Sequence, residues 1–239
     1  MTQKLFLEHP YMRDWDGTVI GHTAEGGLIL EATIFYPQGG GQPGDSGILH
    51  WQGGQIEIAT TVKGDSDTIV LVPAEPAALP PVGTELRQAV DWDRRYAHMK
   101  IHTALHLLAV VIPLPVSGGA ITAETGRLDF NMPDPLDDKE AVEAALQDLI
   151  DKDLPVTETW ITDAELQANP SLVKTMSVKP PMGAGKVRLI RIGEGEDQVD
   201  LQPCGGTHVA STAEIGQIRL GKVEKKGREN RRVNLHLVA

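Results

Sequence analysis

The chain has 239 residues, 41% of them hydrophobic and 23% charged, values that are ordinary for a soluble globular protein with one large or two small domains. It has no apolar run long enough to span a bilayer and no signal-peptide pattern at its start, so we expect neither a membrane anchor nor secretion. A single cysteine excludes an internal disulfide and is typical of a protein in the reducing cytoplasm.

The net charge of −11 argues against a nucleic-acid partner only if the charges are spread evenly, and they are not. Residues 1–92 hold 4 Lys and Arg against 12 Asp and Glu, whereas residues 171–239 hold 12 against 7. A basic face on an otherwise acidic protein can bind a phosphate backbone. For any one lysine, a solvated surface is the simpler interpretation.

The first part of the chain, residues 1–92, has the pattern of an all-β domain. Its short apolar runs are separated by glycine-rich turns and lie at 5–7, 28–30 and 69–72. The pairs Gly26-Gly27 and Gly53-Gly54 are typical of hairpin loops. No stretch has a helical period, and we expect a small barrel because closure removes exposed strand edges.

A glycine-rich loop, Gly39-Gly40-Gly41, lies within residues 35–45. Three glycines permit positive φ angles and a close backbone approach. A phosphate-binding P-loop requires a Lys and a Ser or Thr directly afterwards, and neither is present. The residues alone therefore favour a tight turn inside the barrel.

The next element is a predicted helix that carries His102 and His106 and ends before Pro113. Asp91 or Asp93 caps its start. Because residues four apart lie on the same face of a helix, both imidazoles can reach one metal ion. His98, one turn earlier, allows an alternative site built from three histidines of this helix.

Residues 126–130 then alternate like a strand, and residues 137–154 form the clearest amphipathic helix, capped by Asp137 or Asp138. A loop without acidic residues covers 174–185. The remaining predicted elements are a short helix at 163–169 and strands at 156–162, 186–192, 198–201, 215–220 and 232–238. A basic turn region at 222–231 separates the last two strands.

A second pair of metal-binding residue types, Cys204 and His208, lies about a hundred residues after the first pair. Two histidines from the helix plus Cys204 and His208 make four nitrogen and sulfur donors. This is the donor set of a tetrahedral zinc site.

Three motifs together carry a family resemblance. Residues 102–108 read His-Thr-Ala-Leu-His-Leu-Leu, residues 204–208 read Cys-Gly-Gly-Thr-His, and residues 35–45 read Phe-Tyr-Pro-Gln-Gly-Gly-Gly-Gln-Pro-Gly-Asp. The combination resembles the editing domain of alanyl-tRNA synthetases and their free-standing AlaX-type relatives. The three motifs span residues 35–208, and weaker similarity continues almost to the end of the chain.

The resemblance implies an α+β protein with two domains. Residues 1–92 would form the N-terminal small β-barrel, which holds the glycine-rich loop. Residues 93–239 would form a zinc-containing editing domain, a two-layer α/β structure with an antiparallel sheet.

The resemblance also implies one zinc ion per chain, bound by His102, His106, Cys204 and His208. Two roles for the ion stay open. It can lower the pKa of a bound water to about 7, or it can be held by all four protein ligands and position substrate or stabilise the fold. No Glu stands between the two helical histidines, so the His-Glu-x-x-His protease mechanism is excluded.

Five further residues are candidates for the editing pocket. By resemblance, Gln42 and Asp45 would be the polar members of a loop that lies against the pocket. Ser117 or Thr122 would present a hydroxyl to a small amino acid, and Asp129 would orient a ligand histidine. The alternatives are ordinary turn residues for the two hydroxyls and a strand-edge carboxylate for Asp129.

The implied function is trans-editing, the hydrolysis of the ester in mischarged tRNA(Ala), with serine as the foremost amino acid and glycine as the second. A synthetic site sized for alanine cannot exclude glycine and rejects an added hydroxyl only about 100-fold, so a second site is needed. We expect no use of ATP, because the two domains leave no room for an ATP-binding catalytic domain; the oligomeric state is not predicted. The expected tRNA-binding residues are the basic ones of the turn region: Lys222, Lys225, Lys226, Arg228 and Arg231.

Two other functions fit the same residues. One is a zinc-stabilised RNA-binding module without catalysis, which would bind RNA and release no amino acid. The other is a metal hydrolase of a small ester or amide, for which the basic end of the chain would have no role.

Overall fold

The computed structural model describes residues 1–136, 138–176 and 185–238. The chain divides into two compact units, Met1–Tyr96 and Ala97–Ala239, and helix α2 (Trp92–Val111) begins in the first and continues in the second. None of the helices in these described ranges is long and apolar enough to cross a membrane.

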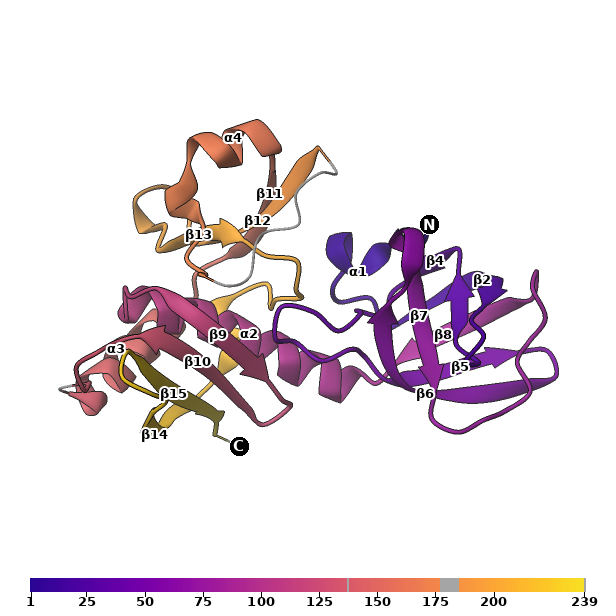
Figure 1. The fold of residues 1–239 in the computed structure, drawn as a ribbon, viewed down its shortest axis with the longest axis horizontal. Helices are drawn as coiled ribbons and strands as arrows, with labels where there is room; N and C mark the ends of the chain where they lie inside the picture. The colour runs from indigo at the N-terminus through magenta and orange to yellow at the C-terminus, as the bar shows by residue number, and fades with distance from the viewer. Residues whose placement is uncertain (137, 177–184, 239) are drawn as a thin grey trace. The chain divides into compact units, whose positions relative to one another are not determined.

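The first unit is a closed barrel of six strands in the order β2-β3-β7-β6-β5-β8, with antiparallel neighbours throughout (Figure 1). The strands are β2 Asp14–His22, β3 Leu28–Leu30, β5 Gly47–Trp51, β6 Gly54–Lys63, β7 Ile69–Pro73 and β8 Glu85–Val90. Their alternate residues fill the interior, where Leu28 and its partner Leu71 are fully buried. The predicted N-terminal barrel is confirmed.

The apolar run at 5–7 was predicted as part of the β pattern, and that prediction is wrong: Leu5–Glu8 is the one-turn helix α1. It follows the two-residue strand β1 (Gln3–Lys4), which pairs in parallel with β4 (Ala32–Thr33). Leu5 and Phe6 are both buried in the barrel core. A strand would turn consecutive side chains to opposite faces, whereas a helical turn buries these two neighbours together.

The second unit contains a four-stranded antiparallel sheet in the order β14-β15-β10-β9 (Figure 1). Its strands are β9 Val116–Ile121, β10 Thr125–Asn131, β14 Ile218–Lys225 and β15 Asn230–Leu237. Helix α2 lies directly on β10, since a Cβ at Gly126 would meet Ile101 Cγ2 at 2.5 Å and Leu105 Cδ1 at 3.1 Å. Glycine at this position lets the histidine-bearing helix approach the sheet closely.

Helix α3 (Lys139–Asp151) covers the sheet edge at β14. The side chains of Glu143 and Gln147 accept hydrogen bonds from the backbone N–H groups of Leu220 (2.6 Å) and Ile218 (3.1 Å). These bonds satisfy donors that an edge strand otherwise exposes. Asp138 caps α3 by accepting from Ala141 N, and the alternative cap, Asp137, lies outside the described residues.

A separate three-stranded antiparallel sheet completes the second unit. It consists of β11 (Val156–Thr162), β12 (Lys186–Ile192) and β13 (Asp200–Pro203), with the short helix α4 (Asp163–Ala168) following β11. The first two strands have the predicted bounds, whereas β13 starts two residues later than predicted. Residues 177–184 of the predicted loop lie outside the described ranges.

The basic turn region predicted at 222–231 is shorter than expected. Strand β14 runs on to Lys225 and β15 begins at Asn230, so Lys222 and Lys225 lie on a strand. The pairing of β14 with β15 shifts register between Leu220 and Val223, which marks a bulge. After the bulge, β14 and β15 stay paired through charged residues that the sequence pattern assigned to a turn.

Candidate metal centre

The first half of the centre lies on α2, whose start and direction are set by ordinary helix signals. Asp91 accepts a hydrogen bond from the backbone N–H of Arg94 at 3.3 Å, and the helix ends two residues before Pro113. His102 and His106 lie on the same side of the helix, both nearly buried. Their ring centroids are 5.3 Å apart, so the pair can face one point.

The second half of the centre lies on the loop after β13, which holds Cys204 and His208. Arg188 of β12 fixes this loop, because its guanidinium donates to the backbone carbonyls of Cys204 (3.2 Å) and Gly206 (2.9 Å). The backbone N–H of Cys204 donates in return to Arg188 O at 3.2 Å. The loop is therefore held by backbone contacts that do not use the two candidate ligand side chains.

The structure brings the four predicted ligands together. Each offers one donor atom, and all four atoms lie within 4.8 Å of one another. Cys204 Sγ is 3.4 Å from His102 Nε2 and 3.3 Å from His208 Nε2. Bond lengths of about 2.0–2.1 Å to nitrogen and 2.3 Å to sulfur place neighbouring N and S donors of a tetrahedral zinc site about 3.6 Å apart. The group therefore fits a metal ion of this size, and His98 is not part of it.

The tautomer of His208 follows from its contact with Thr103. The Thr103 hydroxyl donates to Met99 O at 3.0 Å and lies 3.1 Å from His208 Nδ1. Because a hydroxyl has a single proton, His208 Nδ1 must be the donor to Thr103. The unprotonated Nε2 of His208 then points at Cys204, as metal binding requires.

His106 is oriented by a buried carboxylate. Its Nδ1 lies 3.0 Å from Asp200 Oδ2, and Gln202 and Lys174 also donate to this carboxylate. Burial raises the pKa of Asp200, but the hydrogen bond and charge of His106, with those of Lys174, outweigh it and lower the pKa to about 2. The ionised Asp200 holds the proton on His106 Nδ1 and leaves Nε2 for a metal.

The protonation states of Cys204 and His208 favour metal binding. Burial raises the pKa of the Cys204 thiol, but the nearby His102 outweighs it and holds that pKa well below its usual value. Burial and the neighbouring His102 lower the pKa of His208 to about 3. Burial also lowers the pKa of His106, yet the hydrogen bond to Asp200 outweighs it and raises the pKa to about 9. A thiolate at Cys204 and a neutral imidazole at His208 are the forms that bind metal, whereas His106 must release a proton when a metal binds.

Asp129, predicted to orient a ligand histidine, has other partners in this structure. Its carboxylate accepts from Arg127 (2.7 Å) and Arg232 (2.7 and 3.0 Å). Burial raises the pKa of Asp129, but these hydrogen bonds outweigh it and lower the pKa below its usual value. The carboxylate that contacts a ligand histidine is Asp200, which the sequence reasoning missed. The sequence contained a signal for this contact. Asp200 and Gln202 are two residues apart on the strand that leads to Cys204, so their side chains lie on the same face of that strand.

The two hydroxyl candidates differ in their surroundings. Ser117 is half-buried on β9 and lies 3.0 Å from Asp129 O and 3.1 Å from Asn230 Oδ1. Thr122 is exposed in the turn between β9 and β10, where its hydroxyl donates to Thr125 O and accepts from the Glu124 and Thr125 N–H groups. The Thr122 hydroxyl is thus engaged in closing its own turn.

Gln42 and Asp45 belong to the first unit and are both buried. The backbones of Gln42 and Gly39 exchange hydrogen bonds of 3.0 and 3.1 Å around a tight turn with positive φ at the two glycines between them. Asp45 forms a buried ion pair with Arg95, whose Nε lies 2.9 and 3.0 Å from its two oxygens. Breaking such a pair by removing one partner costs about 3–5 kcal/mol. Asp45 therefore ties the glycine-rich loop to the start of α2.

The five predicted basic residues are not equivalent. Lys226 pairs with Glu224 at 2.8 Å and Arg228 with Glu229 at 3.6 Å. Arg231 is buried, and its guanidinium donates to the backbone carbonyls of Pro133 (2.6 Å) and Asn230 (3.3 Å). The remaining two, Lys222 and Lys225, are exposed on β14.

Comparison with known proteins gives two family matches and several full-length relatives. Residues 187–234 match the threonyl and alanyl tRNA synthetase second additional domain, and residues 15–94 match the class II (A) tRNA synthetases. The chain is 34% identical to an alanine–tRNA ligase of Pyrobaculum arsenaticum over 94% of its own length but only 25% of that protein. It therefore spans about a quarter of the ligase.

Shorter relatives match from end to end. The chain is 32% identical to the alanyl-tRNA editing protein AlaX-M of Methanosarcina barkeri over 100% of both chains. It is 33% identical to AlaX-M of Saccharolobus solfataricus over 98% of both. The barrel, the two sheets of the second unit and the His/Cys cluster thus occur in a chain that belongs to the family of the alanyl-tRNA editing proteins of the AlaX-M type.

Proposed function

We propose that this protein is a zinc-dependent trans-editing hydrolase that deacylates mischarged tRNA(Ala), with Ser-tRNA(Ala) as its foremost substrate and Gly-tRNA(Ala) as the second. Two observations support the proposal. The full-length relatives are named alanyl-tRNA editing proteins. The four donors His102, His106, Cys204 and His208 converge in the second unit.

The reaction is ester hydrolysis. The bond between the carbonyl carbon of the amino acid and the terminal ribose oxygen breaks. The hydroxyl of a water molecule is added to that carbon, and the second proton of the water goes to the ribose oxygen. The products are the free amino acid and a tRNA with a free terminal hydroxyl, and no ATP is consumed.

The donor set favours zinc over harder ions, since a thiolate and three imidazoles suit zinc better than magnesium or calcium. Bound at this position, zinc supplies a positive charge that can polarise or position the ester. A site closed by four protein ligands favours positioning over water activation, because catalytic zinc usually keeps one ligand position open. The protein's own part is to hold the donors through Thr103, Asp200 and Arg188.

Ser117 is the stronger candidate for recognising the substrate side chain. Its one hydroxyl proton is directed at Asp129 O or Asn230 Oδ1, so its oxygen keeps lone pairs that can accept a hydrogen bond. The hydroxyl of a bound serine would donate to this oxygen, whereas an alanine methyl would leave it unpaired. Leaving a buried polar group unpaired costs about 1–3 kcal/mol.

One assay separates this proposal from the two other functions. The purified protein is incubated with Ser-tRNA(Ala) and with a small serine ester, each with and without a zinc chelator. We expect release of serine from the tRNA, little release from the small ester, and loss of both after chelation. An RNA-binding module would release nothing, and a small-molecule hydrolase would prefer the ester.

A further inference from the structure

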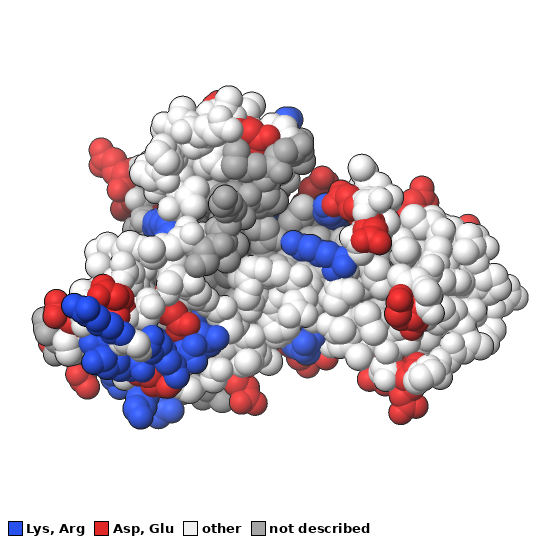
Figure 2. Space-filling model, in the orientation of Figure 1, with Lys and Arg blue, Asp and Glu red and all other residues white. Residues whose placement is uncertain are grey.

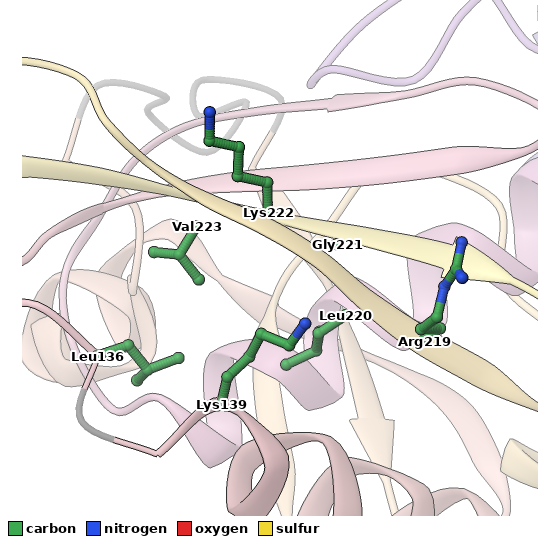
Figure 3. Close-up of a pocket in the computed structure, with 7 residues that line it drawn as sticks. All are labelled: Leu136, Lys139, Arg219, Leu220, Gly221, Lys222 and Val223. Carbon is green, nitrogen blue, oxygen red and sulfur yellow. The ribbon is translucent and has the colours of Figure 1, made fainter.

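A cavity of about 450 Å³ lies at the edge strand β14 of the four-stranded sheet, where that strand has its bulge. Figure 3 shows its walls: Lys139 reaches from the start of α3 toward Leu220, and Arg219 and Lys222 extend from β14. Its apolar lining consists of Leu136, Leu220 and Val223. The hollow therefore combines a hydrophobic floor with three cationic side chains from two elements.

These three cations have no ion-pair partner within the described part of the chain. Lys139 is half-buried, and Arg219 and Lys222 are exposed. The nearby basic residues Lys226 and Arg228 are each paired with a glutamate. Glu143, the acidic residue of α3 that contacts β14, accepts a hydrogen bond from the backbone of Leu220. The three cations thus form no direct ion pair among the described residues, and the Glu143 carboxylate is held at the cavity wall by the backbone of Leu220.

Three unpaired cations around a hollow are suited to an anion with more than one charged group. Figure 2 shows blue side chains gathered at the end of the second unit where Figure 1 labels β14 and β15. Figure 3 shows Lys139 on the side of β14 that carries Leu220 and Val223, whereas Arg219 and Lys222 extend from the other side of the strand. Successive phosphates of a nucleic-acid backbone supply several closely spaced negative charges.

We propose that Lys139, Arg219 and Lys222 form a binding site for the phosphodiester backbone of the tRNA, with the apolar floor in contact with ribose. This inference rests on the proposed function, because tRNA is the partner that the proposed function supplies. It adds Lys139 and Arg219, which lie outside the basic segment predicted from the sequence. The site contacts phosphates and sugars, so it contributes affinity and position and no base specificity.

The test is the salt dependence of binding to uncharged tRNA(Ala), which hydrolysis cannot consume. The unmodified protein is compared with the double variant K139Q/R219Q from about 50 to 200 mM salt. Removal of one phosphate-binding cation lowers the slope of log K against log salt by about 0.7–0.9. We expect the slope of the double variant to fall by roughly 1.4–1.8 and its affinity at the lowest salt to fall about tenfold.

Two further variants separate charge from folding. Lys152→Gln removes the same charge at the other end of α3, about 20 Å from Lys139, and should leave the slope unchanged. The charge-preserving variant K139R/R219K should restore the slope. If K139Q/R219Q does not fold, the salt slope of the single variant Lys139→Gln is measured instead. We expect that slope to decrease by about 0.7–0.9.

An unchanged slope in a folded K139Q/R219Q protein would overturn the inference. So would a variant that binds tRNA normally but no longer binds inorganic phosphate, because the cavity would then be a small-anion site. Deacylation by the unmodified protein is measured in parallel. If the protein releases no amino acid but the salt slopes differ as expected, the enzymatic proposal fails and the backbone site stands. If it releases the amino acid but the slopes are equal, only the backbone site is rejected.

Discussion

At the scale of single residues, the centre depends on side chains that never touch the metal position. Thr103 fixes the tautomer of His208, and Asp200 fixes that of His106. Both contacts leave Nε2 directed into the cluster. Without them, each imidazole could rotate or adopt the other tautomer, and the four donor atoms would no longer face one point.

The Asp200→Asn variant tests this orienting role. The amide keeps the shape of the side chain but loses the negative charge that holds the proton on His106 Nδ1. We expect zinc affinity to fall about 10- to 100-fold, measured by competition with a chelator of known affinity. Cys204→Ala, which removes a ligand, should reduce zinc content further. Asp129→Asn is the matched control and should not change the affinity, since Asp129 contacts Arg127 and Arg232. Equal affinities for Asp200→Asn and Asp129→Asn would contradict the account.

Ser117→Ala tests substrate recognition at the same scale. Removal of the accepting oxygen should slow deacylation of Ser-tRNA(Ala) by about ten- to hundred-fold, the equivalent of about 1–3 kcal/mol. Zinc content should not change. Thr122→Ala provides the comparison, because its hydroxyl closes an exposed turn, and its effect should be the smaller of the two. A larger loss in Thr122→Ala would reverse the assignment.

At the scale of elements, the position of the centre depends on the contact between α2 and β10. Gly126→Ala places a methyl 2.5 Å from Ile101 Cγ2, and overpacking of this kind costs typically about 1–3 kcal/mol. We expect a lower melting temperature and weaker zinc binding, since the helix carries His102 and His106. Gly118→Ala on the neighbouring strand is the control, because its methyl would meet Asp129 Oδ2 at an ordinary 3.6 Å. Equal melting temperatures for the two variants would show that the close approach does not matter.

Several elements could be predicted because their signals are local. Strand 186–192 contains four Val, Leu and Ile residues and is followed by Gly193, and α2 ends two residues before Pro113, so both could be predicted from neighbouring residues. Residues 5–7 could not, because three apolar residues fit a strand or a helical turn equally well. The bulge in β14 coincides with Gly221, a glycine inside a strand that the prediction did not interpret as a bulge signal.

The candidate ligand group was predictable, and the contacts that support it were not. His102, His106, Cys204 and His208 are residue types with metal-binding spacing, which a sequence displays directly. Asp200 and Thr103 act through contacts with residues about a hundred positions away, and only the fold brings them together. The same holds for Lys139, which reaches β14 from another part of the chain.

At the scale of the whole molecule, the excess of basic residues in 171–239 suits the proposed binding of tRNA by an otherwise acidic protein. Neutralising Lys225, Lys226 and Arg228 together should weaken tRNA binding and reduce the salt slope by about 0.7–0.9 for each of the three that binds a phosphate. Arg231→Gln should instead lower the melting temperature, because its buried guanidinium is bonded to backbone carbonyls. A triple variant with unchanged affinity and slope would exclude this segment from the interface.

The proposed function requires this protein to distinguish a mischarged tRNA from a correctly charged one. The most direct measurement is the deacylation rate of the unmodified, zinc-loaded protein on Ser-tRNA(Ala) and on Ala-tRNA(Ala) under identical conditions. A pocket that gains a hydrogen bond only from serine should hydrolyse Ser-tRNA(Ala) about ten- to hundred-fold faster. Gly-tRNA(Ala), which lacks the hydroxyl, should react more slowly than Ser-tRNA(Ala). Equal rates on the serine and alanine substrates would contradict the editing function.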